Sequence, residues 1–217
     1  MILMERKTFL IKIVHDNSEK TVDNLKNFLP GIIEKTEDIS NFSIWKAEDM
    51  IFGYYETTRE ATASDTIIRS CLVEALGADA IILASPGNMR LMYNAIGLPR
   101  EDKSALRQRV FITRLKPGCA EEYKRRHDAI TPKAEEPARN RPTNNFTIWN
   151  AGDYICGYSE IDAFYVPPDT EHAKKRTVAW ETKMLEIMDW LTNDVDYISG
   201  EQHVKIRCLY SSFTYSA

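Results

Sequence analysis

The residues best suited to acid/base chemistry lie between Glu121 and Pro132, in the stretch EEYKRRHDAITP. A turn signal and a strand-like run precede this stretch, which we predict to be helical. Tyr123 and His127 stand four residues apart, so a helix places their side chains on one face. An imidazole with a pKa of about 6.5 can accept or release a proton near neutral pH. From these residues alone, His127 is either an acid/base group or a surface or capping histidine, with Tyr123 then a half-buried core residue.

The chain also contains an internal repeat. Residues 41–56 read NFSIWKAEDMIFGYYE and residues 145–160 read NFTIWNAGDYICGYSE, with 10 of 16 positions identical at an offset of 104. Upstream, FLIKI at residues 9–13 pairs with FITRL at residues 111–115 at an offset of 102. A period of this length is that of one small domain. We therefore predict a duplicated domain.

The two predicted domains are residues 1–104 and 105–217, joined by the charged, proline-led segment from Pro99 to Ser104. In each domain, a strand is followed by a helix, two further strands, a second helix and a last strand. The hairpin between the two middle strands has Gly152 in the second copy and Glu48 in the first, for which we expect a less demanding turn. The expected ranges, first copy before second, are strands 7–14 and 109–115, helices 18–36 and 119–136, strands 42–45 and 146–149, helices 64–77 and 171–191, and last strands 89–94 and 203–210.

This order predicts an α+β class with two ferredoxin-like repeats, in which helices cover one face of each antiparallel sheet. The other face would be bare and apolar, and such a face is expected to find a partner. We predict that the two copies cover each other as a pseudo-dimer within one chain, an intrachain dimeric α/β-barrel. Met184, Leu185, Met188 and Leu191 follow helical spacing and are expected to form the buried stripe of the last helix.

Composition narrows the classes of partner. Hydrophobic residues make up 43% and charged residues 28% of the 217 residues, which is typical of a soluble globular protein. A net charge of −4 gives no electrostatic footprint for nucleic acid. The N-terminal apolar run is too short and too charged for a signal peptide or a membrane span, so we expect a cytoplasmic protein with no membrane partner. The four cysteines lack C-x-x-C spacing, which predicts reduced thiols and no metal site.

Three motifs in the second copy resemble the L-rhamnose mutarotase family. They are the string EEYKRRH at residues 121–127, the strand NFTIW at residues 145–149, and a tryptophan-bearing helix around Trp180. The resemblance covers residues 109 to about 213 and implies a dimeric α/β-barrel that interconverts the anomers of L-rhamnose. It implies that His127 is the proton donor and that Tyr123, Phe146 and Trp180 line a pocket for a monosaccharide.

This sequence departs from the family pattern at two positions. Phe146 stands where the family commonly has a tyrosine that contacts the sugar, and Glu181 stands where it has a second tryptophan after Trp180. In the first copy, the positions that match His127 and Tyr123 hold Leu25 and Thr21, so we expect one working site and a degenerate N-terminal partner.

Mutarotation needs proton transfer at the anomeric hydroxyl and at the ring oxygen, and it needs no metal or other cofactor. Asp128, Asp153 and Glu160 are further polar groups that could reach a bound sugar or lie on a solvated surface. The first hypothesis is a mutarotase for L-rhamnose or a related 6-deoxy sugar. The alternative is a non-catalytic saccharide-binding or assembly protein, and a weaker third is a monooxygenase, since one fold hosts many activities. We expect a monomer with an internal pseudo-dimer, which can also form a homodimer.

Overall fold

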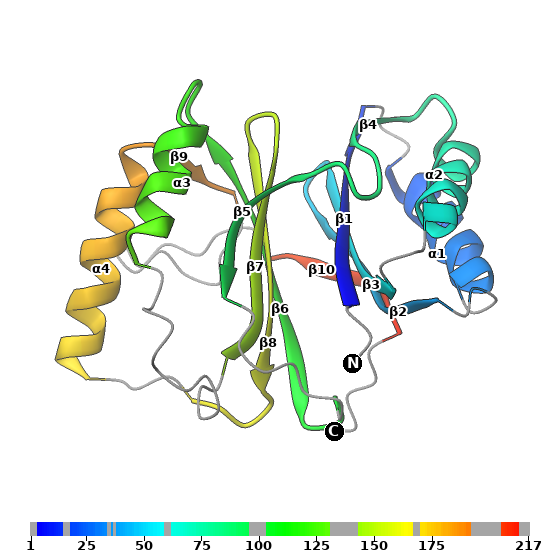
Figure 1. Cartoon of the computed structure of the whole chain (residues 1–217). Coiled ribbons are helices and arrows are strands. Elements are labelled where there is room, and N and C mark those ends of the chain that lie inside the picture. Colours follow the sequence, from blue (N-terminus) through cyan, green and yellow to red (C-terminus); the bar gives the residue numbers. More distant parts are fainter. Residues whose placement is uncertain are drawn as a thin grey trace. The chain divides into compact units, whose positions relative to one another are not determined.

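The computed structural model of the protein describes residues 4–14, 18–33, 36, 38–58, 62–95, 103–130, 143–166, 170–191 and 205–212. Within these ranges, ten strands form two five-stranded antiparallel sheets, and the chain also has four helices (Figure 1). The predicted α+β class is therefore confirmed.

The two halves of the chain share one order of elements. The first half contains β1 (Met4–Ile13), α1 (Ser18–Ile33), β2 (Ile39–Ala47), β3 (Met50–Thr58), α2 (Thr62–Leu76), β4 (Ala80–Ala84) and β5 (Arg90–Ala95). The second contains β6 (Leu106–Leu115), α3 (Ala120–Asp128), β7 (Thr143–Ala151), β8 (Tyr154–Asp162), α4 (Glu171–Leu185), β9 (Met188–Trp190) and β10 (Arg207–Ser211).

The last strand of each half belongs to the sheet of the other half. The strand orders are β10-β2-β3-β1-β4 and β5-β7-β8-β6-β9. Two compact units result, Met1–Met89 with Arg207–Thr214 and Arg90–Ile206 with Tyr215–Ala217, called the first and second unit below. The expectation that the strands at 89–94 and 203–210 close their own repeats is wrong. The domain boundary between residues 104 and 105, which was predicted from the sequence repeat, stays a prediction.

The strand that does complete each β-α-β-β-α-β order was missing from the sequence-based assignment. It is β4 in the first unit and β9 in the second, each paired with the first strand of its own repeat. Helix α4 ends at Leu185 and the chain enters β9 after a short turn, so Met188 lies in a strand and not in a helical stripe. Met184 and Met188 are both buried in one core, and their helical spacing therefore conceals the change of structure between them.

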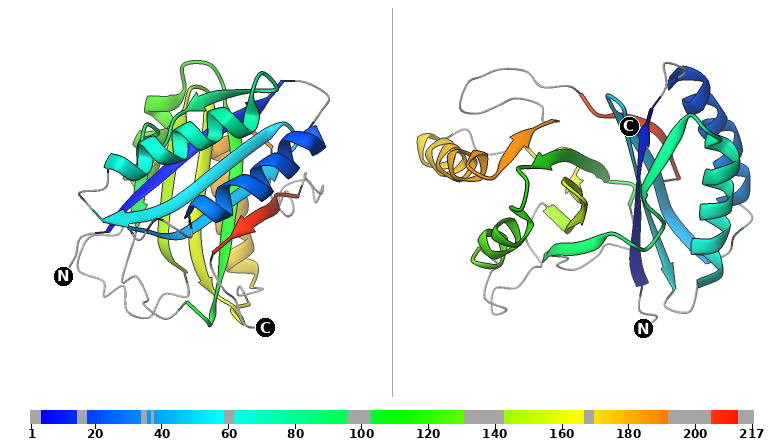
Figure 2. Two further views of the ribbon diagram at one scale, coloured as in Figure 1. Left: turned by 90° about the vertical axis from the view of Figure 1, so that its right-hand side faces the viewer. Right: turned by 90° about the horizontal axis from the view of Figure 1, so that it is seen from above.

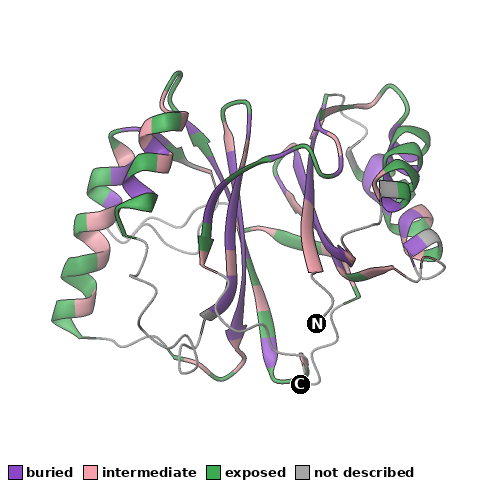
Figure 3. Cartoon of the chain, in the orientation of Figure 1, coloured by how far each residue is buried: buried purple, intermediate pink, exposed green. Residues whose placement is uncertain are grey.

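In the first unit, α1 and α2 lie side by side over one face of the sheet (Figure 2). Buried residues on these helices face the strands, and their outer sides are exposed (Figure 3). The core includes Phe9, Leu25, Phe42 and Leu72, each with no exposed surface. None of the helices in the described ranges is long and apolar enough to cross a membrane.

The hairpin turns of the two copies have the same kind of backbone conformation, although only the second copy has a glycine there. Glu48 has a φ of 50° and Gly152 has a φ of 56°, so both lie in the left-handed region. The expectation of a less demanding turn at Glu48 is therefore wrong. A two-residue hairpin needs a positive φ for its strands to keep their twist, and Glu48 adopts this conformation although a side chain disfavours it.

Candidate functional site

Helix α3 presents Tyr123 and His127 on its buried face. Their exposed fractions are 2% and 6%, so the interpretation of His127 as a surface residue is wrong. The helix ends at Asp128, and the part predicted beyond residue 130 lies outside the described residues. Gly118, with a φ of 77°, makes the turn that leads from β6 into the helix.

Charged residues of the same string attach α3 to the end of α4. Glu122 accepts hydrogen bonds of 2.7 Å from both Arg125 and Arg126, and these guanidinium groups lower its pKa to about 2. Arg126 also donates to Glu186 at 2.8 Å and to the carbonyl of Lys183. Arg126 is only 9% exposed, so this contact is part of the packing between the helices. The helix that carries His127 is thereby connected to the helix that carries the predicted tryptophan.

One ring nitrogen of His127 is held by the backbone. Nδ1 lies 3.0 Å from the carbonyl oxygen of Tyr123, and because a carbonyl only accepts, Nδ1 carries the hydrogen. In the neutral ring, Nε2 is then the basic nitrogen. The Tyr123 ring stacks on the imidazole at a centroid distance of 4.2 Å, and the Trp180 ring meets its edge at 5.2 Å.

Burial changes the acidity of both side chains. It lowers the pKa of His127 below 6.5, against smaller opposing effects of the Tyr123 carbonyl and the charge of Asp128. Burial raises the pKa of the Tyr123 phenol, which stays protonated. The site therefore holds a neutral imidazole above a neutral aromatic ring at pH 7.

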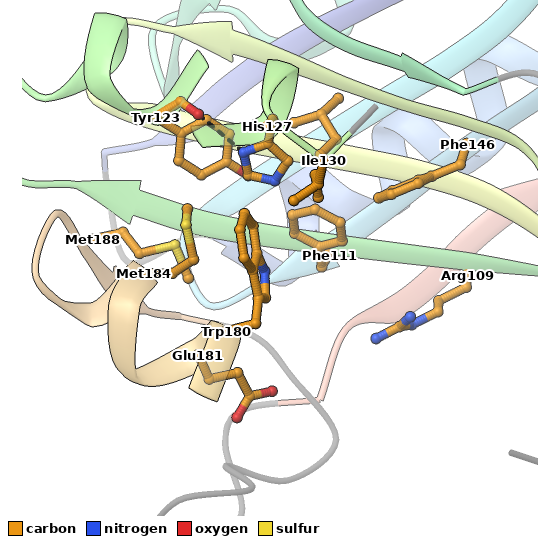
Figure 4. Close-up of a pocket in the computed structure, with 11 residues that line it drawn as sticks. Arg109, Phe111, Tyr123, His127, Ile130, Phe146, Trp180, Glu181, Met184 and Met188 are labelled. Atoms are coloured by element: carbon orange, nitrogen blue, oxygen red, sulfur yellow. Dashed lines mark hydrogen bonds between the residues drawn. The ribbon is translucent and has the colours of Figure 1, made fainter. Parts of the chain in front are cut away.

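These residues border a cavity of about 230 Å³ in the second unit (Figure 4). All four site residues predicted from the sequence line it, namely His127, Tyr123, Phe146 and Trp180. Most of the wall is aromatic or aliphatic, and its charged groups are Arg109 and Glu181. The remaining lining residues are Phe111, Ile130, Ile148, Met184 and Met188.

The floor of the cavity depends on a glycine. Phe111 in β6 is in register with Gly157 in β8, and a Cβ atom at Gly157 would lie 2.0 Å from Cε1 of the Phe111 ring. Only glycine leaves room for the ring in this position. The same pair recurs in the first unit as Phe9 over Gly53.

The other polar candidates lie away from this cavity. Glu160 has no exposed surface and accepts hydrogen bonds from Lys103 at 2.7 Å, from Asn145 at 3.1 Å and from Tyr158 at 3.1 Å. This is a buried structural network, and neither the solvated nor the sugar-binding interpretation fits it. Asp128 is exposed and pairs with Lys124 at 2.8 Å on the outer side of α3.

In the first unit, the position that matches His127 lies in apolar packing. Leu25, which matches His127, belongs to the same core cluster as Phe9 and Phe42 and has no exposed surface. Thr21 is also buried. Among the described residues, the first unit thus has no imidazole at the position that matches the site.

Three residues of this region were not predicted from the sequence, namely Tyr93, Phe111 and Arg109. Tyr93 lies in β5, and its ring is 5.5 Å from His127 and 5.5 Å from Phe146. The similarity between RLMY at residues 90–93 and RCLY at residues 207–210 marks the strand that carries it. Phe111 was part of the detected repeat but was assigned only to a strand. In the described part of the chain, no group of three or more His, Cys, Asp or Glu residues is arranged to hold a metal ion.

Comparison with solved structures gives weak overall similarity. A proposed monooxygenase from Fusobacterium nucleatum subsp. nucleatum has 9% identity and a TM-score of 0.49, over 100% of this chain and 97% of the other. An anthrone oxidase-like protein has 13% identity and a TM-score of 0.45, over 99% and 100%. A proposed monooxygenase from Lactobacillus acidophilus has 10% identity and a TM-score of 0.43, over 98% and 97%. No curated protein sequence matches the chain.

Comparison with family models agrees with the motifs in the second half. The model described as rhaM, L-rhamnose mutarotase, matches residues 108–211. The matched range includes all four predicted site residues and extends through β10. The resemblance predicted from the sequence is therefore confirmed for residues 108–211, which match the L-rhamnose mutarotase family.

Proposed function

We propose that the protein is a mutarotase that interconverts the α and β anomers of L-rhamnose or a related 6-deoxy sugar. The observation that carries the proposal is a buried, neutral imidazole with an oriented tautomer beside a small aromatic cavity. The family match at residues 108–211 supports the same reaction.

His127 would move one proton between two oxygens of the sugar. Nε2 takes the proton of the anomeric hydroxyl, O1, and the bond between C1 and the ring oxygen breaks as C1=O1 forms. The ring oxygen, O5, then takes the proton from the imidazolium. Because O1 and O5 are both bonded to C1, one nitrogen can serve both. Rotation about the C1–C2 bond and the reverse steps give the other anomer, and the imidazole returns to its neutral form.

The walls of the cavity suit a small, partly apolar sugar. Its volume of about 230 Å³ is below the range of about 300–1,000 Å³ that drug-sized ligands occupy. Trp180, Phe111 and Phe146 offer aromatic surface for the deoxy face, and Phe146 offers no hydroxyl. Tyr123 is stacked beneath the imidazole, so we assign it chiefly to supporting His127 through its ring and its carbonyl.

Saturation-transfer NMR on a panel of 6-deoxy sugars tests the proposal. We expect the protein to accelerate exchange between the two anomeric protons of at least one of these sugars, and substitution of His127 by leucine to remove the acceleration. Binding without acceleration would favour the non-catalytic saccharide-binding alternative. If no sugar of the panel binds or shows accelerated exchange, both the mutarotase proposal and the saccharide-binding alternative are rejected.

Activity should decline on the acid side of His127's pKa. The proposed mechanism starts from the neutral ring, and the protonated fraction grows as pH falls through a pKa that lies below 6.5. We therefore expect kcat/KM for anomer exchange to be constant between about pH 7 and about pH 8 and to fall below pH 6.5. Exchange NMR measures the rates, and titration of the His127 Cε1 proton gives the pKa directly. A profile with its midpoint above 6.5 would contradict this role.

A further inference from the structure

We propose that Tyr93, contributed to the second unit by β5, is a positioning residue for His127. This proposal adds a residue to the site of the proposed function, and the part of its test that measures kcat rests on that function. Tyr93 lies outside the range matched by the family model, in the half of the chain that precedes β6.

Tyr93 completes a ring of aromatic contacts around the imidazole. Its ring meets His127 at a centroid distance of 5.5 Å and an interplanar angle of 63°, an edge contact. Tyr123 stacks on the same imidazole and Trp180 meets its edge. Tyr123 and Trp180 come from α3 and α4, and Tyr93 adds a contact from the sheet to the His127 ring. Tyr93 is 8% exposed, so its own orientation is defined by packing.

The same strand also contacts the start of α3. Arg90 and Glu121 form a bidentate ion pair, in which Nη2 donates to Oε2 at 3.0 Å. Arg90 and Glu121 are on the surface, so this pair contributes little stability by itself. Together with the Tyr93 contact, however, it means that β5 contacts both ends of α3. Arg90 lies near the first turn of the helix and Tyr93 near its last. Helix α3 is therefore oriented by a strand from the other half of the chain.

The first unit supplies an internal comparison. Tyr210 occupies the matching place in β10, where its ring lies 5.9 Å from Phe42, as that of Tyr93 lies 5.5 Å from Phe146. Arg207 likewise approaches Glu19, at 3.9 Å. The contact between this tyrosine and the phenylalanine thus occurs with or without a histidine.

In the second unit the tyrosine also meets an imidazole, that of His127. The position that His127 occupies is held by Leu25 in the first unit, within an apolar core. The structural part of the tyrosine's role can therefore be measured at Tyr210 and subtracted from the effect measured at Tyr93. What remains is the contribution of Tyr93 to the orientation of His127.

The experiment compares Tyr93→Leu, Tyr93→Phe and Tyr210→Leu in the full-length chain. Leucine keeps apolar volume without a ring, which favours folding of the variants. We expect Tyr93→Leu to lower kcat for anomer exchange by about 10- to 100-fold, because small displacements of a reacting group are costly. Tyr93→Phe should stay within about threefold of the parent, and Tyr210→Leu should lower Tm but not kcat.

NMR of the sugar-free protein gives a second readout. In Tyr93→Leu the His127 ring protons should lose the ring-current shift from Tyr93, and the pKa of His127 should move toward 6.5 as water gains access. Both should be unchanged in Tyr210→Leu. Equal losses of kcat in Tyr93→Leu and Tyr210→Leu, or an unaltered His127 spectrum in Tyr93→Leu, would overturn the proposal.

The two proposals fail in different ways. If the parent protein exchanges no anomers, the proposed function is rejected, while the His127 spectra still decide whether Tyr93 positions the ring. If the parent is active and Tyr93→Leu is as active with the parental His127 spectrum, the positioning role is rejected and the function stands.

Discussion

Replacing His127 with leucine is expected to reduce the rate of anomer exchange by about a hundred- to ten-thousandfold, the usual contribution of a positioned acid/base group. Leucine suits a buried position because Leu25 occupies the matching place in the first unit. Alanine would leave a cavity at this 6% exposed site and could lower stability by itself. Exchange NMR measures the rate, and thermal unfolding should show a Tm close to that of the parent at pH 7.

Two controls accompany this variant. Leu25→His should not create a second site, because Leu25 is packed with Leu29 and Leu72 in the first core, each with no exposed surface, and an imidazole there would have no open side for a sugar. The double variant Leu25→His, His127→Leu should therefore remain inactive. Exchange at the parental rate in His127→Leu, or restored exchange in the double variant, would refute the assignment.

Dividing the chain between residues 104 and 105 is expected to leave neither fragment folded as a monomer. Fragment 1–104 loses β10, whose Leu209 and Tyr210 pack on the first core. Fragment 105–217 loses β5, whose Met92 and Tyr93 are buried in the second. Each lost large core side chain costs about 2–5 kcal/mol, and the total stability of a domain is about 5–15 kcal/mol.

The two fragments are expected to differ in folding and self-association. The first fragment should aggregate or stay unfolded. The second carries β10, which matches β5, and two copies can exchange it so that β10 of one pairs with β7 of the other. We therefore expect fragment 105–217 to be either unfolded or a homodimer, and a mixture of both fragments to form a one-to-one complex. Analytical ultracentrifugation distinguishes these states, and a folded monomer of either fragment would contradict the exchange of strands.

The residues of the candidate site were predicted from the sequence better than the assembly of the sheets was. The spacing of Tyr123 and His127 was sufficient to place them on one helix face, because helical geometry depends on local spacing. Phe146 and Trp180 were added by the family resemblance, and all four line one cavity. Tyr93 was missed because its distance from His127 arises from strand pairing, which local periodicity does not specify.

The errors in the fold have similar causes. A strand pattern does not name its neighbour, and the assumption that consecutive strands pair nearby assigned β5 and β10 to their own repeats. The three-residue β9 is too short to show an alternating pattern, and Met184 and Met188 happen to keep helical spacing across the turn. Glu48 shows that hairpin geometry can prevail over the local preference of a residue.

The exchange of β5 and β10 also makes completion of each sheet independent of protein concentration. In an assembly of separate subunits, a strand supplied in trans is lost on dilution, and apparent stability follows mass action. Here both strands belong to the same polypeptide as the sheets they complete, so their docking is an intramolecular step with a constant effective concentration. The surroundings of His127 that depend on β5 should therefore persist at protein concentrations at which a comparable pair of subunits would have dissociated.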